Sequence, residues 1–272
     1  MVIQPATGAK DLNPQQVEVN RCLTNNLAYV YKLWGFEEVS PPRIERMETL
    51  KAGGAIQSSE IVKLVTDEPL GLRPEMTASI ARSACTRLAN KTRPLRLWAS
   101  GTVFESRESV EGGQLIEEHL QSGVEIFGIK DISGEIELMS LLLHSYKKLE
   151  ISNINETTLL IGHTSLINMI ISRIPEKLKT GTKNALVDFN NIFIEDLEID
   201  IATKDLLKDS LKCRGDFKII LDKFKSIFGE DNELDKIYRL LNAIQPIANE
   251  HNVKLQLDPT FLPQYDLYTG LV

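Results

Sequence analysis

Apolar positions recur along the chain at helical spacing in some stretches and alternate in others, and they predict an order of helices and strands. The first clear element is a helix from Asn13 to Trp34, whose apolar residues return every three or four positions. Asn13 and Gln16 suit a capping box, and Pro14 suits the first turn, where no backbone N–H is needed. Gly35 is a natural stop.

Further elements follow from the same two periods. They are a short strand at 36–39, a helix from Pro74, strands at 95–104 and 119–127, a helix at 132–149, a strand at 157–161, helices through 164–250, and strands at 253–257 and 266–272. Strands that follow one another without a helical crossover favour an antiparallel sheet. The sequence therefore predicts an α+β fold, an antiparallel sheet flanked by helices, with a helical insertion.

Composition and charge exclude several classes of protein. The chain has 272 residues, 25% of them charged, and a net charge of −7, which argues against a dedicated nucleic-acid binder. No stretch approaches the roughly 20 apolar residues that cross a bilayer, and the first residues lack a secretory signal, so we expect a cytoplasmic protein. Cys22, Cys85 and Cys213 lie far apart, and we expect three reduced, mostly buried thiols.

One predicted strand carries polar residues at alternate positions. Gln121, Gly123 and Glu125 share one face of it, and Gly123 leaves backbone open where a ligand could approach. A glutamine and a carboxylate across that gap could hydrogen-bond an imidazole or hold an ammonium group. The alternative is an ordinary solvent-facing side of an antiparallel strand.

Four ordered segments resemble the catalytic domain of class II histidyl-tRNA synthetase. They are Gly35-Phe-Glu-Glu-Val-Ser-Pro-Pro42, Leu72-Arg-Pro-Glu-Met-Thr77 with Arg82, Gly101 to Glu125, and Tyr265-Asp-Leu-Tyr-Thr-Gly270. The similarity covers residues of about 10–130 and 253–272. It implies a single synthetase-like catalytic-type domain over 1–272, with the helical block of about 164–250 as an insertion. We expect no anticodon-binding domain in these residues and a chain truncated after Val272.

The resemblance also implies a histidine site. By position, the family's histidine-contacting residues become Glu75, Thr77, Gln121, Glu125 and Tyr268, and all five are the expected residue types. Two carboxylates with neutral donors suit a small cation with polar edges. The alternative is that Arg73 and Arg82 pair with these acids as a structural ion network.

The departures from the family concern its ATP-binding arginines. The synthetase motif reads Phe-Arg where this chain has Phe104-Glu105, and Pro263 stands where the family has a second arginine. A carboxylate facing a phosphate reverses the sign of the interaction, and loss of such a donor costs roughly 3–4 kcal/mol in the transition state. Arg107 lies two positions on, and the sequence alone leaves open whether it replaces the missing arginine.

This combination resembles the histidyl-tRNA-synthetase-like regulatory subunit of ATP phosphoribosyltransferase. The resemblance implies no aminoacylation, partnership with the short catalytic subunit in histidine biosynthesis, a homodimer, and no tRNA. Free histidine is a further candidate ligand, and no cofactor is expected. The four histidines have no metal-ligand spacing, so no metal site is expected. The alternative function is a histidyl-tRNA synthetase (histidine-tRNA ligase) or a fragment of one.

Overall fold

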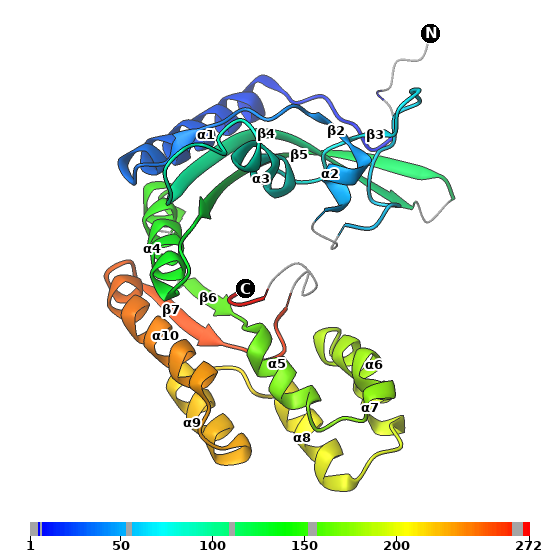
Figure 1. Ribbon diagram of the computed structural model, residues 1–272, viewed down its shortest axis with the longest axis vertical. Coiled ribbons are helices and arrows are strands. Elements are labelled where there is room, and N and C mark those ends of the chain that lie inside the picture. The colour runs from blue at the N-terminus through cyan, green and yellow to red at the C-terminus, as the bar shows by residue number, and fades with distance from the viewer. Residues whose placement is uncertain (1–4, 6, 53–55, 109–111, 152–156, 263–268) are drawn as a thin grey trace. The chain divides into compact units, whose positions relative to one another are not determined.

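The computed structural model describes residues 5, 7–52, 56–108, 112–151, 157–262 and 269–272. They form two compact units, one within 1–134 and 144–150 and the other within 135–143 and 151–272 (Figure 1). The helices of the described residues are α1 Pro14–Leu33, α2 Met47–Lys51, α3 Thr77–Cys85, α4 Ile132–Lys148, α5 Thr164–Ile171, α6 Glu176–Val187, α7 Asn191–Asp196, α8 Ile201–Leu211, α9 Phe217–Phe228 and α10 Asn232–Glu250. The strands are β1 Glu37–Glu38, β2 Ile44–Arg46, β3 Leu70–Leu72, β4 Leu95–Glu108, β5 Gln114–Phe127, β6 Thr157–Ile161 and β7 Val253–Leu257.

Helix α1 begins as its sequence predicts. The Asn13 side chain accepts from the Gln16 backbone, and the Gln16 side chain accepts from the Asn13 backbone, each at 2.9 Å. This capping box satisfies two backbone donors that have no partner inside the helix. Gly35 follows the helix with φ of +79°, a conformation that glycine adopts without steric cost.

The sheet of the first unit is built on a long antiparallel ribbon of β4 and β5. Leu95 pairs with Phe127 and Glu108 with Gln114, and β1 adds to β4 in parallel. Strands β2 and β3 form a separate antiparallel pair. Both ribbon strands are longer than the sequence predicts.

Helices pack on the two faces of this ribbon. On one face, Ile80 and Ala84 of α3 join Leu97 and Ala99 of β4 in a fully buried cluster. Trp98 lies between those two β4 residues, so its side chain points to the opposite face. There its ring lies 5.6 Å from that of Tyr31 in α1.

The second unit is mostly helical around one strand pair. Strands β6 and β7 run parallel, with Leu159 opposite Leu255, and α9 and α10 pack against β7. The helices predicted within 164–250 are confirmed as α5 to α10. No helix among the described residues has the length and apolar character needed to span a membrane.

Several predicted elements need correction. Helix α3 begins at Thr77 rather than Pro74, because Glu75 caps its first turn. The short elements β2, α2 and β3 were not predicted, and the parallel pairings β1–β4 and β6–β7 show that the sheets are only partly antiparallel. Of the strand expected at 266–272, residues 266–268 lie outside the described residues, and Leu271 forms an isolated bridge with His163.

Candidate functional site

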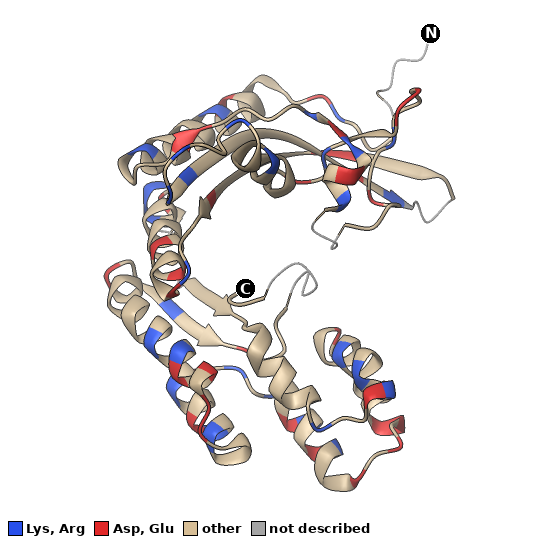
Figure 2. Cartoon of the chain, viewed as in Figure 1, with Lys and Arg blue, Asp and Glu red and all other residues tan. Residues whose placement is uncertain are grey.

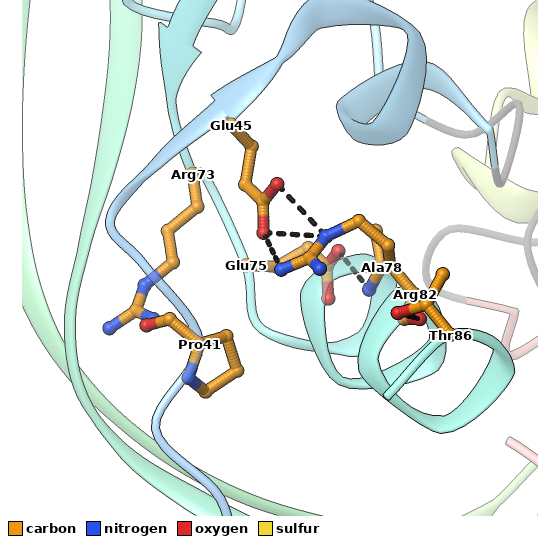
Figure 3. A network of polar contacts seen from close by, with 7 residues as sticks. All are labelled: Pro41, Glu45, Arg73, Glu75, Ala78, Arg82 and Thr86. Carbon is orange, nitrogen blue, oxygen red and sulfur yellow. Dashed lines mark hydrogen bonds and ion pairs between the residues drawn. The ribbon is translucent and has the colours of Figure 1, made fainter. Parts of the chain in front are cut away.

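The N-terminus of α3 is organised by the carboxylate of Glu75. It accepts hydrogen bonds from the backbone N–H groups of Thr77 and of Ala78, the latter at 2.9 Å (Figure 3). The residue at the formal cap position, Met76, provides no side-chain bond. Glu75 therefore replaces it as the cap, and this role fixes the carboxylate beside the first turn of the helix.

Thr77 connects this helix end to strand β5. Its side chain hydrogen-bonds the carboxylate of half-buried Glu125. Burial raises the pKa of Glu125, and the charge of Glu75 raises it further, against the opposing effect of the Thr77 bond. Two carboxylates thus interact across the helix–strand junction, an arrangement that a bound cation would stabilise.

Beyond Glu125 the same face of β5 offers an open surface. The Gln121 side-chain oxygen is buried and has no hydrogen-bond partner among the described residues. A Cβ added at Gly123 would meet nothing within 4 Å, whereas one added at Gly101, the residue opposite Gln121, would lie 2.8 Å from the Arg73 guanidinium. The structure thus brings four of the five predicted histidine contacts to one face, with an unsatisfied acceptor beside open space. Tyr268 and Pro263 lie outside the described residues.

The arginines near this site are bound elsewhere. Arg82 donates to Glu45 through Nη2 at 2.7 Å and through Nε, and the Glu45 side chain is only 6% exposed (Figure 3). Buried Arg73 donates to the backbone oxygens of Pro41 and Thr102, and burial chiefly lowers its pKa. Among the described residues, neither arginine forms an ion pair with the two carboxylates of the candidate site. The alternative that these arginines form ion pairs with the two acids is therefore wrong, although the charge of Glu75 acts on Arg73 and raises its pKa against the effect of burial.

A second cluster lies further along the ribbon, at the position of the lost arginine. The register places Glu105 directly opposite Glu117. Arg107 donates to both carboxylate oxygens of Glu105, each at 3.0 Å, and lies 3.8 Å from a carboxylate oxygen of Glu117. The Arg107 bond lowers the pKa of Glu105. Arg107 shares the face of Glu105, but two acids already engage its charge.

His119 completes this cluster, which the sequence alone did not reveal. Its Nε2 lies 3.5 Å from a carboxylate oxygen of Glu117, and one ligand atom each from His119, Glu117 and Glu105 lie within 4.8 Å of one another. That spacing could hold a metal ion. Arg107 supplies a positive charge to the same carboxylates, so an ion network accounts for the arrangement. The cluster forms because strands β4 and β5 pair, and the spacing of these residues along the sequence does not show that pairing.

The thiols contribute no chemistry to this site. All three are free, but only Cys213 is buried, whereas Cys22 and Cys85 are exposed. The expectation of mostly buried thiols is therefore wrong. Burial raises the pKa of Cys213, which makes that thiol less reactive.

Comparisons with known proteins identify the family of the chain. The family model described as histidyl-tRNA synthetase matches residues 8–272. Curated relatives from Prochlorococcus marinus (strain MIT 9313) and Synechococcus sp. (strain CC9902), both named ATP phosphoribosyltransferase regulatory subunit, are 52% identical over 272 residues, which are 100% of this chain and 69% of each relative.

Solved structures share the fold. An ATP phosphoribosyltransferase regulatory subunit/histidyl-tRNA synthetase from Bacillus halodurans has a TM-score of 0.86 at 22% identity, covering 100% of this chain and 72% of that one. A chain of the ATP phosphoribosyl transferase (HisG:HisZ) complex from Thermotoga maritima has a TM-score of 0.67 at 17% identity, covering 93% and 85%. The predicted class II synthetase-like α+β fold is confirmed. The chain belongs to the histidyl-tRNA synthetase family and, within it, to the ATP phosphoribosyltransferase regulatory subunits.

Proposed function

We propose that the chain acts without catalysing aminoacylation, as the partner that the short catalytic subunit of ATP phosphoribosyltransferase requires in the first step of histidine biosynthesis. The observation that carries this proposal is the charge of the β4–β5 ribbon. Where the synthetase resemblance calls for an arginine toward ATP, Glu105 faces Glu117, and Arg107 is engaged by both. An adenylation site needs positive charge there.

The test of lost aminoacylation is ATP–pyrophosphate exchange with histidine. A synthetase supports exchange, and we expect none from this chain at any ATP concentration. Histidine-dependent exchange would instead establish the alternative function, a histidyl-tRNA synthetase. Co-purification with a short-form catalytic subunit, followed by its activity assay with and without this chain, tests the partnership directly.

We further propose that the face formed by Glu75, Thr77, Gln121 and Glu125 binds free histidine and passes that information to the catalytic subunit. Its support is the capped helix end, the paired carboxylates and the unsatisfied Gln121 oxygen. Tyr268 stays a prediction from the resemblance. Binding and partner association are linked reciprocally, so the catalytic subunit should change the affinity for histidine. Gln121→Ala should weaken histidine binding and leave partner activation intact.

A homodimer is proposed on the resemblance and on the surface of α1. Val17, Val19 and Tyr29 are exposed on that helix, and a groove of about 860 Å³ runs beside it against Leu120 of β5. Exposed apolar surface of this kind marks an interface. Sedimentation of the isolated chain should show about 61 kDa, twice its mass on this two-fold symmetry. A monomer at micromolar concentration would contradict it.

Two further parts of the proposal concern the domain organisation of the chain and its location in the cell. We propose that both units belong to one synthetase-like catalytic-type domain, in which residues 164–250 are an insertion. The site of action proposed is the cytoplasm, which fractionation of cells that produce the full-length protein can check.

A further inference from the structure

The helical unit carries an apolar and acidic segment, residues 188–201, which runs from the end of α6 through α7 to the start of α8. We propose that this acidic-apolar segment is the docking surface for the catalytic subunit, through a complementary patch of apolar side chains ringed by lysine or arginine. The inference rests on the proposed function, since it names the surface through which that partnership would act.

Large apolar side chains are unusually exposed in this segment. Ile192 is 77% exposed and Ile201 79%, and both aromatic residues, Phe189 and Phe193, are also exposed. Transfer of such a side chain from water into an apolar interface is favourable in free energy. Four of them within fourteen residues leave a substantial gain in free energy for a partner that covers them.

The charged residues of the segment itself all have one sign. The segment holds five acidic residues and no lysine or arginine, and in Figure 2 its acidic positions at the end of α7 and in the turn after it are red. Glu195 pairs with Lys208 at 2.5 Å, and Asp200 caps α8. Asp196 and Glu198 are exposed and form no ion pair with any residue that the structure describes. They are available to a basic partner.

The segment is held in place by its neighbours. The Lys204 ammonium donates to the Glu195 backbone oxygen at 2.6 Å, which ties α8 to the end of α7. The Arg214 guanidinium lies 6.0 Å from the ring centre of Phe189, a residue that keeps φ of +53°. A surface ordered before binding loses less entropy on association.

The negative charge of the segment also indicates which kind of partner can bind there. In a symmetric contact with a second copy, the same surface would meet itself and bring two sets of five acids together. Like charges placed opposite one another disfavour that contact. Anionic lipid surfaces are disfavoured for the same reason. A basic, apolar protein surface fits, and the catalytic subunit is the partner that the proposed function requires.

The test measures binding of a short-form catalytic subunit to the chain and to two matched variants. Ile192→Asp changes the segment, and Ile219→Asp is the control, because Ile219 is 71% exposed and also lies in the first turn of a helix, α9. We expect Ile192→Asp to weaken binding about ten-fold or more. The control should bind like wild type, and circular dichroism should show both folded. Asp196→Lys with Glu198→Lys should slow association and reduce its dependence on salt.

The outcomes separate the two proposals. If wild type does not bind or activate the catalytic subunit, the proposed function is wrong, and this docking surface with it. If wild type binds and Ile192→Asp binds equally well, only the surface is wrong. Equal weakening by Ile192→Asp and Ile219→Asp would also overturn the assignment, since it would show no preference for residues 188–201.

Discussion

Replacing Glu125 by Gln removes one charge from the candidate histidine site and keeps the size of the side chain. If Glu125 and Glu75 hold the ammonium group of histidine, the variant loses a charge-assisted hydrogen bond worth about 1.5–3 kcal/mol. Since about 1.4 kcal/mol corresponds to a factor of ten, the Kd for histidine should rise about ten- to hundred-fold. Thr77 still has an oxygen acceptor in the variant, so the helix–strand junction should stay intact.

The same substitution has a predictable effect on stability. Burial raises the pKa of Glu125 above its ordinary value of 4.5, so the folded chain binds a proton there that the unfolded chain has released. This contribution to stability is complete below pH 4.5 and is lost as the pH rises through the raised pKa. Glu125→Gln cannot ionise and avoids that loss. We expect it to be at least as stable as wild type at pH 8, although it binds histidine poorly.

Calorimetry with L-histidine at pH 8, followed by urea unfolding, checks both effects. Glu118→Gln is the matched control, because Glu118 is an exposed residue of the same strand whose side chain points to the opposite face. Wild-type affinity should fall as the pH is lowered through the raised pKa of Glu125. Unchanged histidine binding in Glu125→Gln, or equal loss in Glu118→Gln, would refute the reasoning, as would a wild-type chain that binds no histidine.

Three further substitutions test the packing, each by urea unfolding of the isolated chain. Arg82→Met leaves the Glu45 carboxylate buried without its partner and should lower the free energy of unfolding by about 2–3 kcal/mol. This cost is smaller than for a fully buried pair because the Arg82 side chain is 31% exposed. Adding Glu45→Leu should recover most of the lost stability. Leu97→Ala should cost about 2–5 kcal/mol because Leu97 is fully buried, and a cost below 1 kcal/mol would contradict the α3 packing. Gly162→Ala should cost about 3 kcal/mol or more, because its Cβ would lie 1.7 Å from the Phe261 carbonyl oxygen; wild-type stability would contradict that approach.

Local signals predicted most of the regular structure. The capping box at Asn13 and the stop at Gly35 set the ends of α1 to within one residue, because both act through neighbours in sequence. Alternation at Val253, Leu255 and Leu257 predicted β7, whose inward residues are all buried. These elements are determined by residues within or next to them in the sequence.

Elements that depend on distant partners were missed or misplaced. Strands β2 and β3 have three residues each and exist because Ile44 pairs with Leu72 across a long connection. The start of α3 was placed at Pro74 because proline commonly opens a helix, whereas the carboxylate of Glu75 caps a helix that begins at Thr77. Short strands and side-chain caps of this kind are decided by tertiary context.

The candidate site was also predicted only in part: its residues were identified, but their charge partners were not. The resemblance predicts the histidine-contacting role of Glu75, Thr77, Gln121 and Glu125. It does not predict which other side chains surround them. The sequence leaves open that Arg73 and Arg82 pair with these acids, whereas Arg82 is bound to Glu45, which strand β2 places beside it. Partner choice among several nearby charges is a matter of geometry, which local sequence does not contain.

The register of one hairpin connects the two halves of the proposed function. Glu105 and Glu117, then Gln121 and Glu125, all lie on the same face of the β4–β5 ribbon, because each is an even number of residues or one direct pairing from the next. A shift of one residue in either strand would move its whole set to the α1 side. The same pairing therefore places two carboxylates, held by Arg107, at one end of the face and a carboxylate and an amide at the other. On the proposed function, loss of ATP chemistry and a retained histidine site would both follow from side-chain identity on the shared synthetase-like fold.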